Sequence, residues 1–230
     1  RDCDRCADSN AWRQHEPSLL SVQSVPAFAI NQRAFLLLTP AGNVLWDCIA
    51  LIDDATVSLI KGLGGLKAIA ISHPHFYTTN KEWSRVFDAK VYLHAADKMW
   101  VQNPHDGIEF WDGDTHKLMP DVTLVRCGGH FPGGNVLHWG EGAGGKGVVC
   151  SGDILAVTTD RKWLSFLRSY PNWIPCSARE VEAIGRHLQR LAAVFGPVAR
   201  RLGGHGPRQR RHRRGHREQQ HDEQHTHSVV

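Results

Sequence analysis

Residues 66–78 read LKAIAISHPHFYT, a short apolar run that ends on two histidines. Leu66–Ser72 is typical of a buried β-strand because it is short and almost wholly apolar. His73 and His75 lie two positions apart. In an extended chain such residues point the same way, so both rings can face one ion. Pro74 stiffens the spacer between them. The stretch therefore predicts a metal-binding loop at the end of a strand.

Two other apolar runs end in the same manner. Asp121–Cys127 is followed by Gly128-Gly129-His130, and Gly147–Ser151 is followed by Gly152-Asp153. Side chains at strand ends lie in loops, which neighbouring strands bring together. A single histidine beside a strand is more often structural, so the prediction depends on the three motifs in this order. Imidazole and carboxylate ligands suit Zn²⁺, Fe²⁺ or Mn²⁺. We therefore expect one metal site formed by His73, His75, His130 and Asp153.

The rest of this region alternates between strand and helix patterns. Turn residues bound each run, as at Pro40–Asn43. Predicted strands span residues 27–39, 44–47, 66–72, 90–94, 121–127, 135–139 and 147–151. Predicted helices span residues 54–63, with Asp54 as N-cap, 80–88, 97–102 and 178–194. A chain of 230 residues is long enough for one α/β domain with a hydrophobic core.

These motifs together resemble the metallo-β-lactamase fold superfamily of metal-dependent hydrolases. Its first motif, an aspartate after a hairpin, matches Val44–Asp47. Its second, H-x-H-x-D-H, matches the first half of residues 73–78 (HPHFYT). Its third, a histidine before Pro-Gly, matches His130–Gly134, and its fourth, Gly-Asp after an apolar strand, matches Gly152-Asp153. The resemblance covers about residues 27–160. It implies an α/β fold of the αββα type, a four-layer sandwich with two mixed sheets face to face and helices outside.

The sequence departs from the family at two places. Tyr77 and Thr78 stand where the family has the aspartate and histidine that bind a second metal. The fifth motif is a histidine after the last strand, and His205 is its sole candidate. The resemblance therefore implies a single ion held by the three histidines, with zinc expected and Fe²⁺ or Mn²⁺ left open.

A metal in such a site would activate a water molecule for hydrolysis. Asp153 would complete the ligand shell or orient the water. Asp47 would hold a ligand histidine from behind. Tyr77 has two interpretations, a hydroxyl donor to a developing oxyanion and a packing side chain. The substrate would be a small molecule with an ester, thioester, lactone, amide or phosphoester bond.

Two other function classes remain open. The Tyr77-Thr78 substitution also fits a non-catalytic member of the fold whose cleft binds a ligand or protein. A nucleic-acid-processing hydrolase is suggested by the arginine-rich run of residues 208–217 alone, and such runs are more often solvated tails.

Composition divides the chain into three parts. Residues 1–24 form an N-terminal segment with a CxxC pair, Cys3 and Cys6, either half of a zinc ribbon or two plain thiols. Residues 25–198 form the metallo-β-lactamase-like domain. Residues 199–230 form a tail rich in Arg, His and Gln that we expect to be disordered. From Arg200 onward there are eight arginines and three acidic residues, which give this segment a net charge of +5. Because the whole chain has a net charge of +4, the rest of the chain is near −1.

The remaining cysteines are Cys48, Cys127, Cys150 and Cys176, which lie in or beside apolar runs. Free cysteine behaves there as a small hydrophobe, and a disulfide framework belongs to short secreted chains. No run approaches the ~20 apolar residues of a membrane span, and no signal peptide is recognisable. These features predict a cytoplasmic protein with no membrane partner. They leave its oligomeric state open.

Overall fold

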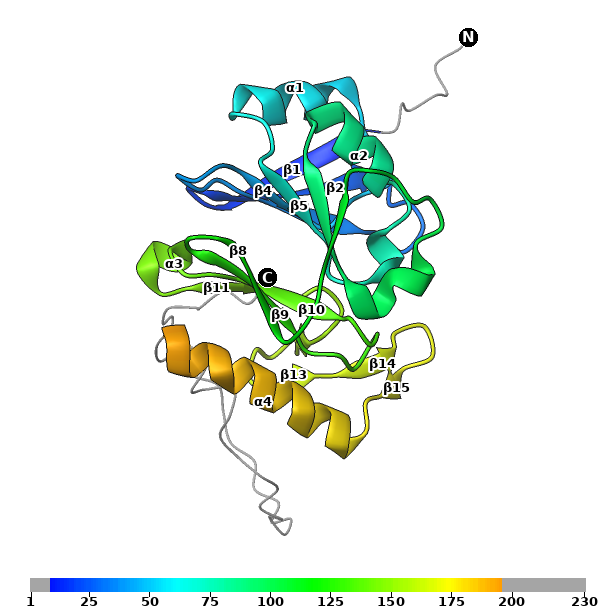
Figure 1. Ribbon diagram of the computed structural model, residues 1–230, viewed down its shortest axis with the longest axis vertical. Helices are drawn as coiled ribbons and strands as arrows, with labels where there is room; N and C mark the ends of the chain where they lie inside the picture. The colour runs from blue at the N-terminus through cyan, green and yellow to red at the C-terminus, as the bar shows by residue number, and fades with distance from the viewer. Residues whose placement is uncertain (1–8, 196–230) are drawn as a thin grey trace, which may run out of the picture.

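The computed structural model of the protein describes residues 9–195, without the side chains of residues 190–195. Two β-sheets of seven and four strands face each other, and helices cover their outer sides (Figure 1). The first sheet contains β1 (Ser9–Glu16), β2 (Leu19–Val25), β3 (Arg33–Leu37), β4 (Val44–Trp46), β5 (Ala68–Ala70), β6 (Lys90–His94) and β7 (Ile108–Trp111). The second contains β8 (Thr115–Met119), β9 (Val122–Arg126), β10 (Asn135–Trp139) and β11 (Val148–Cys150), in the order β11-β10-β9-β8.

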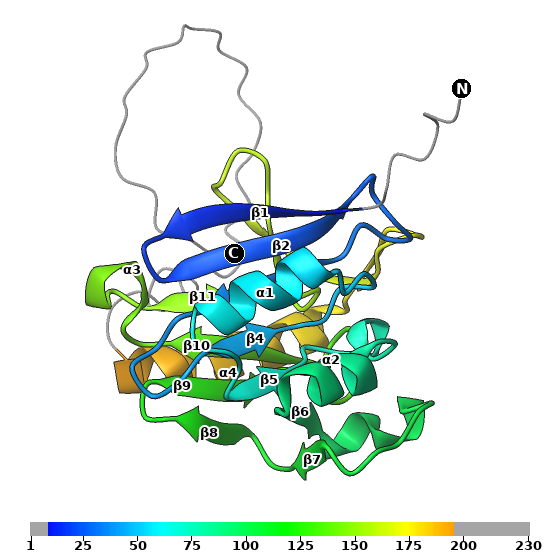
Figure 2. The same cartoon turned by 90° about the horizontal axis from the view of Figure 1, so that it is seen from above.

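Helices and short hairpins complete the domain. Three longer helices are α1 (Asp54–Gly62), α2 (Asn80–Phe87) and α4 (Ala178–Phe195). Shorter helical segments are η1 (Pro74–Phe76), η2 (Ala95–Trp100) and α3 (Gly142–Gly145). After β11 come two hairpins, β12 (Ala156–Val157) with β13 (Leu164–Ser165), and β14 (Leu167–Ser169) with β15 (Ile174–Pro175). Figure 2, seen from above, shows α1 and α2 over the first sheet.

Alternation along the strands produces the layers. On β3, Phe35 and Leu37 face the core between the two sheets, whereas Ala34 and Leu36 face the core beneath α1 and α2. A third core lies between the second sheet and α4, where Val125 and its neighbours meet Ile184 and Leu188 of the helix. Because side chains alternate across a strand, each sheet buries both faces. The four-layer αββα sandwich predicted from the sequence is confirmed.

The first sheet changes direction half-way. Strands β1 to β4 pair antiparallel, and β4 to β7 pair parallel. The carboxyl ends of parallel strands meet at one edge of a sheet. Asp47 follows β4, Ser72 and His73 follow β5, and Asp97 follows β6 through η2. The topology therefore gathers these residues at one edge.

Several boundaries differ from those predicted. The strand predicted over 27–39 is limited to Arg33–Leu37, because residues 26–32 form a loop in which Ala29 and Asn31 have φ of 49° and 56°. The N-cap of α1 is Asp53, whose carboxylate accepts from the Thr56 amide, and not Asp54. The helix predicted over 97–102 is instead the 3-10 segment η2. Short polar elements such as these carry little periodicity to locate them.

The first sheet also includes residues of the N-terminal segment, residues 1–24, that we expected to lie outside the domain. Strands β1 and β2 form a hairpin, and β2 pairs with β3 through five residues. The inner strand buries Leu19 and Val22, whereas β1 at the sheet edge contains several exposed positions. The mixed composition of β1 explains why no strand was predicted there.

Some predictions concern residues that lie outside 9–195. These are the Cys3–Cys6 pair, His205 and the tail of residues 199–230. In the described part, Cys48, Cys127, Cys150 and Cys176 are buried free thiols. None of the helices in that part is long and apolar enough to span a membrane.

Candidate metal centre

The structure brings the four predicted ligand residues together. His73 and His75 follow β5, His130 lies in the loop after β9, and Asp153 follows β11. One donor atom from each residue lies within 4.8 Å of all the others. The segments that carry them are up to 80 positions apart in the chain, from His73 to Asp153, so packing of the two sheets creates the cluster.

The donor atoms are spaced as ligands of one small cation. His75 Nδ1 lies 3.2 Å from His73 Nε2 and 3.4 Å from His130 Nε2. Asp153 Oδ2 lies 3.5 Å from His73 Nε2 and 3.9 Å from His130 Nε2. For bonds of about 2.1 Å, tetrahedral ligands lie about 3.4 Å apart. The donor set and its spacing therefore fit a Zn²⁺-like ion.

His73 is oriented by side chains from behind. The Ser72 hydroxyl donates to Asp47 Oδ1 at 2.8 Å, and the Ser72 amide donates to the same oxygen at 2.7 Å. With its single hydrogen committed, Ser72 Oγ accepts from His73 Nδ1 at 2.8 Å. This leaves the lone pair of His73 Nε2 directed into the cluster. Asp47 thus reaches the ligand histidine through Ser72, a residue that the sequence did not single out.

His130 is oriented by backbone. Its Nδ1 lies 3.0 Å from the carbonyl oxygen of Arg168 in β14. A carbonyl can only accept, so Nδ1 carries the hydrogen and the Nε2 lone pair is free to bind a metal. The ring also packs edge-on against Tyr170, whose hydroxyl donates to the Asp153 carbonyl at 3.3 Å. The β14–β15 hairpin therefore contacts both ligand residues of the second half, through the Arg168 carbonyl of β14 and through Tyr170 directly after it.

The protonation states suit cation binding. Burial lowers the pKa of His73 to about 4, despite the opposing effect of Asp153. Burial and the charge of His130 also lower the pKa of His75. Burial alone would raise the pKa of Asp153, but the neighbouring imidazoles outweigh it and hold that pKa below its usual value. At neutral pH these groups are neutral imidazoles and a carboxylate, the forms that bind metals.

Asp47 gives a second sign that a cation fits here. Burial raises its pKa to about 8; the two hydrogen bonds from Ser72 lower it, and the charge of Asp153 raises it. Its backbone is also strained, with φ of 65° at a non-glycine residue. A cation among the four donors would favour the ionised form of Asp47, which burial disfavours.

The other predicted site residues lie outside the cluster. Tyr77 is 7% exposed and belongs to the core between the first sheet and its helices. Its placement agrees with the packing interpretation, and its role as an oxyanion donor remains a prediction. Thr78 is exposed. In the described part of the chain, neither residue joins the group that could hold a metal.

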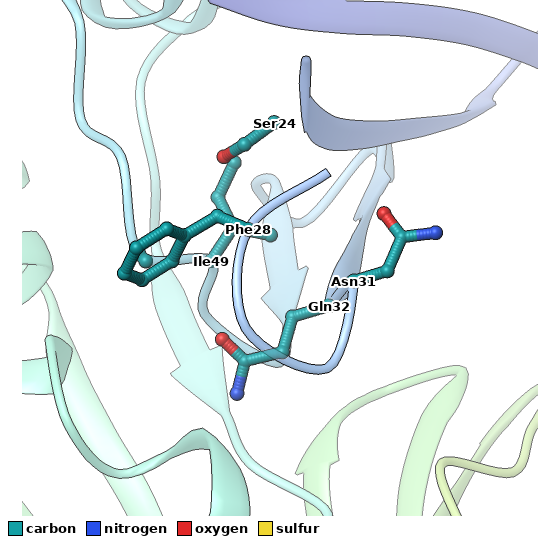
Figure 3. A pocket seen from close by; sticks show the side chains of 6 residues that line it. Ser24, Phe28, Asn31, Gln32 and Ile49 are labelled. Atoms are coloured by element: carbon teal, nitrogen blue, oxygen red, sulfur yellow. The ribbon is translucent and has the colours of Figure 1, made fainter. Parts of the chain in front are cut away.

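Aromatic and polar side chains surround the cluster. The Phe131 ring stacks on His73 and meets the rings of His75 and His130 edge-on. On another side, the Gln32 amide donates to the His75 carbonyl at 2.7 Å. Gln32 also lines a small pocket beneath the β2–β3 loop, with Ser24, Phe28, Asn31, Ile49 and Ala50 (Figure 3). Both His75 and part of Asp153 remain accessible to solvent.

Sequence reasoning missed the residues that support the ligands. They are Ser72, Asp97, Asn135, and Arg168 through its carbonyl. Ser72 lies directly before His73, and this adjacency was the one signal available. The other three residues are distant in sequence from the ligands that they support, and no local pattern distinguishes them.

Comparison with solved structures defines the class of fold. The metallo-β-lactamase DIM-1 matches at a TM-score of 0.58 with 12% identity, over 82% of this chain and 86% of that chain. A quorum-quenching N-acyl homoserine lactone hydrolase matches at 0.51 with 17% identity, over 76% and 78%. The chain therefore has the metallo-β-lactamase fold, which confirms the resemblance drawn from its motifs.

A closer relative in sequence is the uncharacterized protein YmaE of Bacillus subtilis (strain 168). It is 47% identical over 182 residues, which are 79% of this chain and 66% of YmaE. The chain thus spans just under two thirds of the curated relative it matches. No protein-family model matches the chain.

Proposed function

We propose that the chain is a metal-dependent hydrolase that holds one divalent ion, expected to be zinc, on His73, His75, His130 and Asp153. The observation that supports this most directly is the cluster of four donor atoms within 4.8 Å of one another. Solved structures of the same fold include β-lactamases and lactone hydrolases. One of the latter has the product N-hexanoyl-L-homoserine bound at its catalytic metal centre.

The chain's own residues would have two roles, binding the ion and orienting a water molecule. The three histidines would hold the ion, with Ser72 and the Arg168 carbonyl fixing the rings of His73 and His130. A divalent ion bound there would supply activation of a water molecule and polarisation of the bond under attack. The Asp153 carboxylate, 32% exposed, would complete the ligand shell or orient the attacking water.

A single ion is proposed because the second-site ligands of the family are replaced. Tyr77 is buried in the core, and Thr78 offers only an exposed hydroxyl. Neutral hydroxyls are poor zinc ligands compared with carboxylate and imidazole. The substrate class is a small molecule with an ester, thioester, lactone, amide or phosphoester bond.

The same substitution supports a second candidate, a non-catalytic member of the fold that binds a ligand or protein. The nucleic-acid alternative depends on residues 208–217, which lie outside the described part of the chain.

Metal analysis coupled to a substrate panel tests the proposal. The purified full chain should contain about one metal ion per molecule. It should also hydrolyse at least one member of a panel of chromogenic esters, thioesters, lactones, amides and phosphodiesters. The His130→Ala variant should lose both properties. Stoichiometric metal without hydrolysis would favour the non-catalytic candidate. Absence of stoichiometric metal, with properties unchanged by chelation, would contradict the metal site itself.

A further inference from the structure

The shape of the metal centre depends on how the two halves of the fold are held together. His73 and His75 follow the first sheet, whereas His130 and Asp153 follow strands of the second. Two buried polar side chains cross between the halves beside the cluster. Asp97 of η2 is 0% exposed, and Asn135 at the start of β10 is 1% exposed.

Asp97 reaches from the first half to the loop that carries His130. The Gly133 amide donates to Asp97 Oδ1 at 2.8 Å. A Cβ at Gly133 would lie 2.7 Å from Asp97 Oδ2 and 3.0 Å from the Cβ of His94. Gly133 does not have a positive φ. The close approach of the carboxylate is therefore the reason that a glycine is needed there.

Asn135 reaches in the opposite direction. Its backbone amide donates to the Ser72 carbonyl at 3.0 Å. Its side-chain amide donates to the carbonyls of Ile71 and Ser72, both at 3.0 Å. These carbonyls belong to the chain immediately before His73. Asn135 therefore ties the second sheet to the backbone that positions the first ligand.

Both side chains keep one buried acceptor without a partner. In the described part of the chain, Asp97 Oδ2 and Asn135 Oδ1 are buried and accept no hydrogen bond. A buried acceptor without a partner opposes folding. Apolar side chains of similar size would avoid that penalty, so packing alone does not account for this pair. The hydrogen bonds that their side chains make all end on backbone within three positions of a metal-ligand residue.

We propose that Asp97 and Asn135 are positioning residues that set the distance between the His73 side and the His130 side of the metal centre. The proposal rests on the proposed function, because it concerns the geometry of the same site. Neither residue supplies a ligand. Asp97 acts through Gly133 on the His130 loop, and Asn135 acts through the Ile71 and Ser72 carbonyls on His73.

A double-mutant cycle on Asp97 and Gly133 tests this in the full chain. Asp97→Ala should weaken binding of Co²⁺ alone by about 10- to 100-fold, the range for residues that orient ligands, and shift its visible spectrum. Gly133→Ala should do the same, because its methyl group displaces the loop. The double variant should be little worse than either single variant, because Asp97→Ala removes the carboxylate that the methyl group meets.

Asn43→Ala is the matched control. Asn43 is also buried, and its side chain donates to the carbonyls of Leu63 and Gly65. It directly precedes β4, at the opposite end of that strand from Asp47. It should change Co²⁺ affinity by less than about twofold. If Asp97→Ala keeps wild-type affinity and spectrum, or if the two single effects simply add, the proposal is wrong. If Asp97→Ala does not fold, Gly133→Ala alone decides, because it keeps the carboxylate and displaces only the loop.

Hydrogen exchange separates this proposal from the proposed function. In metal-free protein, amides 128–134 should exchange faster in Asp97→Ala than in Asn43→Ala. If wild-type protein binds no metal, the proposed function fails and the positioning role is judged by exchange alone. Equal exchange in the two variants would then overturn the positioning role.

Discussion

His73, in the first half of the fold, is held by side chains, whereas His130, in the second half, is held by backbone. Ser72 and Asp47 form a buried hydrogen-bonded chain behind His73. His130 instead donates to the Arg168 carbonyl from a loop rich in glycine. Single side-chain deletions should therefore damage the first half. In the second half, damage should require a change that moves the backbone.

Removing either ligand histidine should cause the largest loss of activity, and the loss should be similar for the two halves of the site. His73→Ala and His130→Ala should each lower kcat/KM by at least about 10³-fold, the rate equivalent of several kcal/mol. Steady-state kinetics on whichever chromogenic substrate responds, together with metal content, measures this. His138→Gln changes a histidine outside the cluster and should leave both nearly unchanged. Retained activity in either ligand variant would contradict the proposed site.

Ser72→Ala should disturb the orientation of His73 in the first half and leave the His130 side unchanged. Without the hydroxyl, His73 Nδ1 loses its acceptor and the ring loses its fixed tautomer, so metal affinity should fall by about 10- to 100-fold. Competition with a chromogenic chelator measures the affinity. Ser151→Ala is the control, because within residues 9–195 the Ser151 hydroxyl donates to the Gly152 carbonyl and to no other group. Equal affinities for the two variants would show that the Asp47–Ser72–His73 chain has no orienting role.

Gly152→Ala should disturb the contact between the halves. Gly152 has φ of +50°, and a Cβ there would lie 2.5 Å from Ser72 Oγ. Backbone strain and the clash should together lower the free energy of unfolding by about 1–3 kcal/mol and weaken metal binding. Gly144→Ala has φ of +63° with open space around it, so it measures the strain alone. Urea unfolding and chelator competition should show a metal-affinity loss for Gly152→Ala only.

The smallest effect is a pH dependence away from the site. Burial lowers the pKa of His138 in β10 to about 4, from an ordinary 6.5. Below pH 6.5 the unfolded chain binds a proton that folded His138 resists, so the wild type loses stability as pH falls toward 4. His138→Gln lacks this loss. The stability gap between the two metal-free proteins at pH 7 should shrink on acidification. A gap that stays constant from pH 7 to 4 would contradict a neutral buried His138.

Much of the fold could be predicted because its strong signals are local. Leu66–Ser72 and Asn135–Trp139 are short and mostly apolar, and strands lie within both stretches. The loop at residues 26–32 and the hairpin β1–β2 were not predicted. Their conformation follows from pairing with β3 and from left-handed residues such as Ala29, which the local pattern does not reveal.

The residues that could bind a metal follow from local sequence, because each candidate ligand follows an apolar strand and a strand end is visible in local hydrophobicity. How those ligands are supported depends on the packing of the folded chain. Asp47 and Ser72 are 25 positions apart, and Asp97 and Gly133 are 36 apart. Hydrogen bonds over such separations depend on how two sheets pack, and no periodicity in the chain encodes them.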